Sequence, residues 1–149
     1  MIFKKVDGSK VLKITNHIKD MLSNHPDVEI HIGTDSQNHR RFSVYCTVIA
    51  FKMGSRGVHY IYHKQSLPKI KDIWSRLWKE TEFSIEVAEY VKSRMNVDIQ
   101  IDMDFNKDKM HISNKLVSAS RGWANSLGYK VNIKPFSQIA TKAADHYCR

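Results

Sequence analysis

With 149 residues, of which 42% are hydrophobic, the chain is large enough for one domain with its own core and too apolar for general disorder. It has no run of 18 or more apolar residues, which excludes a transmembrane helix. Its 24 Lys and Arg outnumber 15 Asp and Glu, so the net charge is +9 and the pI about 9.6, which favours polyanionic partners, mainly nucleic acid. The first residues lack the features of a signal peptide and the two cysteines form no CxxC pair, so we expect a reduced, cytoplasmic protein.

The hydrophobic pattern predicts helices and strands in succession, with no linker or internal repeat. A helical stripe runs over residues 9–24, with Ser9 as its N-cap, and ends at the polar segment 24–27. Alternating apolar residues predict three strands over residues 28–34, 42–51 and 58–63, whose short connections indicate an antiparallel meander. The remaining predicted elements are a helix over 72–95, a strand over 97–105, a helix over 112–127, a strand over 129–133 and a helix over 139–147.

This order predicts an α/β domain with a mixed five-stranded sheet flanked by helices. The three-stranded antiparallel meander supplies one part of the sheet and two parallel strands supply the rest. We expect a single domain over residues 1–149, in which residues 28–149 form the core and residues 1–27 form an N-terminal helical extension.

Acidic residues fall at the ends of the predicted strands. Asp35 follows the first strand, and Asp102 and Asp104, two residues apart, face the same side of the fourth. Taken singly, each also fits an ordinary solvated residue.

The helices add two further acids. Glu80 lies on the inward stripe of the long helix, where an unpaired carboxylate is costly, whereas Glu86 shares the expected solvent face. Asp145 lies beside small apolar residues in the last helix. A buried ion pair for Glu80 and an ordinary flank position for Asp145 are the structural alternatives.

Several carboxylates that converge on one spot repel each other unless protons or cations intervene, and Mg²⁺ and Mn²⁺ suit such oxygen ligands. An EF-hand is excluded, because Lys107 stands where its loop needs Gly and Ser113 where it needs Glu. The eight histidines show no zinc-ligand spacing, and we expect His31, His59 and His63 to be surface-strand residues.

Four short segments carry a family resemblance. They are Ile-Gly-Thr-Asp-Ser-Gln at 32–37, Ile-Asp at 101–102 followed by Asn106, Ser-Asn-Lys-Leu-Val at 113–117, and Lys-Pro at 134–135 with Ala140 and Ala-Asp-His at 144–146. Together they resemble the YkuK-type family of predicted ribonuclease H-like nucleases. The resemblance covers about residues 28–149 and implies a ribonuclease H-like fold with a carboxylate-bound two-metal site acting on nucleic acid.

Carried over by position, the resemblance implies Asp35, Glu80, Asp102 and Asp145 as the metal-binding and catalytic residues. Asp104 stands where we expect Asn in the family, so it shares or replaces the role of Asp102. The weakest of these transfers is the helix acid, because Glu86 lies only six residues beyond Glu80.

The leading hypothesis is therefore a nuclease that uses two Mg²⁺ or Mn²⁺ ions to hydrolyse phosphodiester bonds of RNA, DNA or a hybrid. Ser113 and Asn114 fit a helix cap as well as a substrate contact. The candidates for binding nucleic acid are Lys107, Lys109, Ser113, Asn114, Lys115, Arg121 and His146. One alternative is a non-catalytic nucleic-acid-binding module with the same fold, and a weaker one is an interaction subunit that docks a partner through the N-terminal helix.

Overall fold

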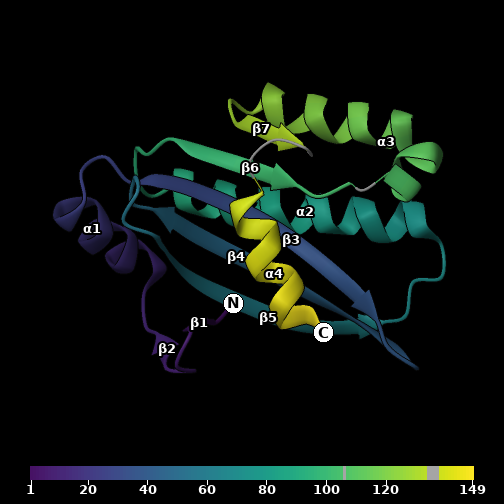
Figure 1. Cartoon of the computed structure of the whole chain (residues 1–149), viewed down its shortest axis with the longest axis horizontal. Helices are drawn as coiled ribbons and strands as arrows, with labels where there is room; N and C mark the ends of the chain where they lie inside the picture. The colour runs from purple at the N-terminus through teal and green to yellow at the C-terminus, as the bar shows by residue number, and fades with distance from the viewer. Residues whose placement is uncertain (106, 134–137) are drawn as a thin grey trace.

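The structure, a computed structural model, describes residues 1–105, 107–133 and 138–149, with the backbone alone described at 107–114. Within these residues, seven strands form one sheet in the order β2-β1-β5-β4-β3-β6-β7, and four helices pack on it (Figure 1). The elements are β1 (Phe3–Lys5), β2 (Lys10–Val11), α1 (Ile14–Asn24), β3 (Glu29–Asn38), β4 (Phe42–Lys52), β5 (Val58–Pro68), α2 (Ile73–Lys92), β6 (Ile99–Met103), α3 (Lys107–Ser126), β7 (Lys130–Ile133) and α4 (Ile139–Cys148).

The central five strands have the predicted arrangement. Strands β3, β4 and β5 form the antiparallel meander, β6 pairs with β3 in parallel, and β7 pairs with β6 in parallel. Strand β5 continues to Pro68, five residues beyond the predicted end, because its pairing with β4 persists as far as Phe42. The mixed α/β sheet is thus confirmed.

The prediction of five strands and of a helix starting at Ser9 was wrong. Residues 1–13 instead form a small hairpin, β1 and β2, that pairs with β5 and enlarges the sheet. Gly8 takes a left-handed φ of 87°, and the Asp7 carboxylate accepts hydrogen bonds from the Ser9 N–H and hydroxyl, so the chain turns where the helix was expected to begin. Val11 then belongs to β2, and α1 begins at Ile14.

Alternation along the strands produces two cores, one on each face of the sheet. On one face, Ile30, Ile32 and their neighbours pack under α1, α2 and α3. The stacked rings of Trp78 and Trp123, with centroids 5.2 Å apart, join α2 to α3. On the other face, a smaller core of short side chains packs under α4, which crosses β3, β4 and β5 (Figure 1). Among the described residues, no helix is both long enough and apolar enough to cross a membrane.

Candidate metal centre at the open edge of β3

Strand β3 is longer than its parallel neighbour, and this difference creates the site. The register pairs Gly33 with Asp102, and β6 ends one residue later at Met103, whereas β3 continues to Asn38. The segment from Asp35 to Asn38 therefore has β4 on one side and an open edge on the other. Side chains from both faces of the sheet can approach one another around such an edge.

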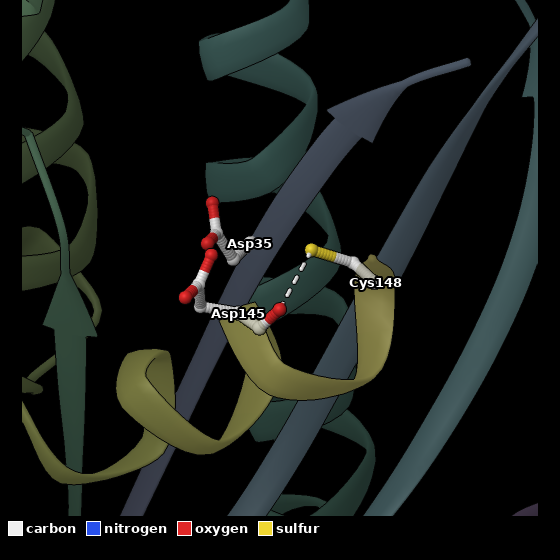
Figure 2. A group of neighbouring side chains, drawn as sticks. All are labelled: Asp35, Asp145 and Cys148. Carbon is white, nitrogen blue, oxygen red and sulfur yellow. Dashed lines mark hydrogen bonds between the residues drawn. The ribbon is translucent and has the colours of Figure 1, made fainter.

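Asp35 points to the face covered by α4, where it meets Asp145 (Figure 2). Ligand atoms of Asp35, Asp145 and Cys148 all lie within 4.8 Å of one another. Both carboxylates have a fixed partner as well: Asp35 accepts the backbone N–H of Ser36 at 2.9 Å, and Asp145 accepts Arg149 at 2.8 Å. Two acids held this close form a strongly negative position that favours a cation.

The close approach of α4 to β3 depends on small residues. A Cβ on Gly33 would lie 2.9 Å from the Thr141 side chain and 3.0 Å from Ala140. Because Gly33 has no side chain, the first turn of α4 can rest directly on β3. Asp145 lies one helical turn beyond Thr141 on α4, and Asp35 lies two residues beyond Gly33 on β3, so the two acids face one another.

The thiol of Cys148 lies beside this acidic pair. Burial, followed by the negative charges of Asp35, Asp145 and Glu80, raises its pKa to about 12. The thiol is therefore protonated at neutral pH and donates a long hydrogen bond, 3.5 Å, to the carbonyl of Asp145 (Figure 2). Hard cations at this position would bind the carboxylate oxygens in preference to the sulfur.

Glu80 approaches the same edge from the opposite face. The prediction that it faces inward is confirmed, since its side chain is only 6% exposed. Its carboxylate accepts the Ser36 hydroxyl at 2.6 Å, one residue beyond Asp35. Glu86 is exposed and lines a separate pocket with Thr47, so Glu80 is the acid of α2 that adjoins the site.

Asp102 is buried, and its two carboxylate oxygens are engaged by other parts of the fold. In the described part of the chain, one oxygen accepts His31 and Asn132, each at 2.9 Å. The other accepts the backbone N–H groups of Ile139 and Ala140, also at 2.9 Å, at the start of α4. A carboxylate suits this position, because the first N–H groups of a helix lack partners within the helix.

His31 was expected on the surface, and that expectation was wrong. It is 1% exposed, because α4 covers its face of the sheet, and its Nδ1 donates to Asp102. The alternating pattern of residues 28–34 gave no sign of a helix on the polar side. His59 and His63 are partly buried, and His59 forms a pair with His17 in which the Nε2 atoms are 2.9 Å apart.

Asp104 lies just beyond the end of β6. If the register of Gly33 with Asp102 is carried two residues further, Asp104 comes level with Asp35. Asp104, Asp102 and Glu80 all line a cavity of about 10 Å³, room for about one water molecule, between α2, the middle of β3 and the end of β6. Asp104 thus adjoins the acids of the open edge, and Asp102 lies two residues before it, within β6.

The predicted nucleic-acid contacts are described only in part. Lys115 and Arg121 are exposed on α3, and His146 is exposed on α4, where its ring lies 5.1 Å from that of Tyr147. The side chains of Lys107, Lys109, Ser113 and Asn114 lie outside the described residues, as does Asn106.

Comparison with known protein families identifies a family for this chain. A family model described as "Ribonuclease H-like" matches residues 13–149, which includes α1 as well as the predicted core. Searches of curated proteins and of solved structures each found no match. The matched range spans nearly the whole chain and every acid of the site, so this chain belongs to the Ribonuclease H-like family.

Proposed function

We propose that the protein is a divalent-metal-dependent nuclease that hydrolyses phosphodiester bonds of RNA, DNA or a hybrid. The observation that carries the proposal is the convergence of Asp35 from β3 and Asp145 from α4, whose ligand atoms lie within 4.8 Å of one another. Family membership and the net charge of +9 support nucleic acid as the substrate.

The donor set fits Mg²⁺ or Mn²⁺, since both prefer carboxylate oxygens. Asp35 and Asp145 would hold one ion, and Glu80 and Asp104 would supply oxygen ligands for a second. When bound, such a pair supplies an activated water and neutralises the departing oxygen of the phosphodiester.

The remaining side chains position these acids. Ser36 donates its hydroxyl to Glu80 and its N–H to Asp35, so one residue orients acids on both faces of β3. Asp102 fixes the first turn of α4 and thereby the placement of Asp145. We therefore propose Asp104, just beyond the end of β6, as the ligand from this part of the chain, and for Asp102 a positioning role in place of the metal-binding role that the family resemblance implied.

A non-catalytic nucleic-acid-binding module is the second candidate. The observation that favours it is the ion pair of Arg149 with Asp145, because a guanidinium already supplies positive charge to one of the acids. Arg149 is 69% exposed, so a metal ion could displace it at little cost.

A cleavage assay distinguishes the two candidates. The protein would be incubated with labelled single strands, duplexes, RNA–DNA hybrids and junctions in Mg²⁺, Mn²⁺ or EDTA. The proposed nuclease requires metal for cleavage. Asp35→Asn should lower its rate by at least 10- to 100-fold, roughly what loss of an outer-shell metal partner costs. Glu86→Gln, which removes an exposed acid from the same helix as Glu80, should retain the wild-type rate. Cleavage that survives EDTA or Asp35→Asn would refute the proposal, and binding without cleavage in every metal would favour the module.

A further inference from the structure

The turn between β3 and β4, residues 39–41, lies at the far end of the open edge that carries Asp35 (Figure 1). Arg40 and Arg41 are exposed in this turn, and Phe42, which follows them, keeps 41% of its surface exposed. We propose that this turn binds an unpaired nucleic-acid strand and leads it along the edge of β3 to the acidic cluster. Binding at the turn stands by itself; only the cleavage that would follow rests on the proposed function.

The turn is fixed to the site by His39. Its backbone N–H donates to the Phe42 carbonyl at 2.8 Å, and the two rings stack with centroids 5.0 Å apart and planes 16° from parallel. The His39 Nε2 atom bonds to the carbonyl of Cys148 at 3.3 Å. Since Cys148 lies three residues from Asp145 on α4, the turn and the acidic pair are held in one arrangement.

The chemistry of the turn matches a single strand better than a duplex. Guanidinium groups bind phosphates of any nucleic acid, but an exposed aromatic ring needs a base whose face is accessible. Bases inside a duplex are stacked on their neighbours, whereas those of a single strand or an overhang are available. From Asp35 to Asn38 the strand advances about 10 Å, at roughly 3.3 Å per residue, so a bound strand could reach both the turn and the acids.

Nearby charge reinforces this interface. The register of β4 with β5 pairs Phe42 with Pro68, which brings the exposed Lys69 beside the turn. The acids of the site lie further back along β3, so the end of the edge is positive and its middle is negative. A phosphate chain would dock at the positive end and pass across the negative part only where cations neutralise the acids.

Fluorescence anisotropy in EDTA, where metal-dependent cleavage does not occur, tests binding alone. The probes are a labelled single strand and a blunt duplex of the same sequence, titrated at several salt concentrations. The variants are Arg40→Ala/Arg41→Ala and Phe42→Ala. The matched control, Lys19→Ala/Arg56→Ala, removes two exposed charges, one on α1 and one in the turn between β4 and β5.

The double arginine variant should weaken single-strand binding and lower the slope of log K against log salt by about 1.4, since each phosphate contact contributes about 0.7. Phe42→Ala should weaken single-strand binding by about 5-fold or more and leave duplex binding unchanged. Phe42→Trp should retain or strengthen it, and also controls for misfolding of the alanine variant. The proposal is overturned if both turn variants bind with wild-type affinity or if the control loses as much affinity as they do. It is also overturned if Phe42→Trp binds as weakly as Phe42→Ala. A metal-dependent cleavage rate measured separately shows whether the proposed function fails independently.

Discussion

Replacing Asp102 by asparagine keeps the shape of the side chain but removes half of its capacity to accept hydrogen bonds. The carboxylate accepts two bonds on each oxygen, from His31 and Asn132 on one side and from the start of α4 on the other. An amide nitrogen cannot accept, so one of these two pairs of donors would face another donor. Hydrogen bonds to charged groups contribute about 1.5–3 kcal/mol each, so two lost bonds destabilise the protein by about 3–6 kcal/mol.

That loss is a large part of the roughly 5–15 kcal/mol that stabilises a typical domain. Urea unfolding followed by circular dichroism would measure it, with Asp104→Asn as the matched control. We expect Asp104→Asn to keep near-wild-type stability and to lose affinity for Mn²⁺, because Asp104 lies past the end of β6 beside Glu80. A positioning role for Asp102 is refuted if Asp102→Asn unfolds like the wild type while its metal affinity falls and that of Asp104→Asn does not.

Three further predictions follow from contacts around the site and the first helix. Gly33→Ala should destabilise the protein by about 1–3 kcal/mol and weaken Mn²⁺ binding, because the new Cβ would push α4 off β3. Urea unfolding measures the first effect, and unchanged metal affinity would contradict the second. Burial lowers the pKa of both His17 and His59, so the unfolded state gains protons first as the pH falls below about 6.5. The melting temperature of the wild type should therefore fall between pH 7 and pH 5, and that of His59→Gln should fall less. An equal fall in the two proteins would contradict this. The Cys148 thiol, with a pKa of about 12, should react with iodoacetamide at pH 7.5 far more slowly in the folded protein than in urea. Mass spectrometry of the labelled peptide measures the two rates, and equal rates would contradict the prediction.

The order of elements could be predicted because strand and helix periods are visible in the sequence. Strands with alternating side chains, such as residues 28–34, and the long stripe of α2 were placed within a few residues of their true bounds. The N-terminal hairpin was missed because Val11 fits both the helical stripe and a short strand. Only its pairing with Phe3, which sequence periodicity does not reveal, decides between them.

The predicted approach of Asp35 and Asp145 is seen in the structure, whereas the surroundings of the individual acids were harder to predict. Position on the inward stripe predicted that Glu80 is buried and Glu86 exposed, but the sequence left open which of the two is the ligand. The separate environments of Asp102 and Asp104 were not predictable, because two acids two residues apart look alike in sequence. Their difference arises from the end of β6 and from the start of α4, which depend on how distant segments pack. The partnership of the residue 39–41 turn with α4 is a tertiary contact of the same kind.

Isothermal titration of the protein with Mn²⁺, with and without a single-stranded oligonucleotide, measures directly whether the acids of the site bind metal. We predict uptake by the wild type, reduced uptake in Asp35→Asn and Asp145→Asn, and wild-type uptake in Glu86→Gln. The proposed metal site is contradicted if folded Asp35→Asn protein binds Mn²⁺ as tightly as the wild type. It is also contradicted if the wild-type protein takes up no Mn²⁺ even with the oligonucleotide present.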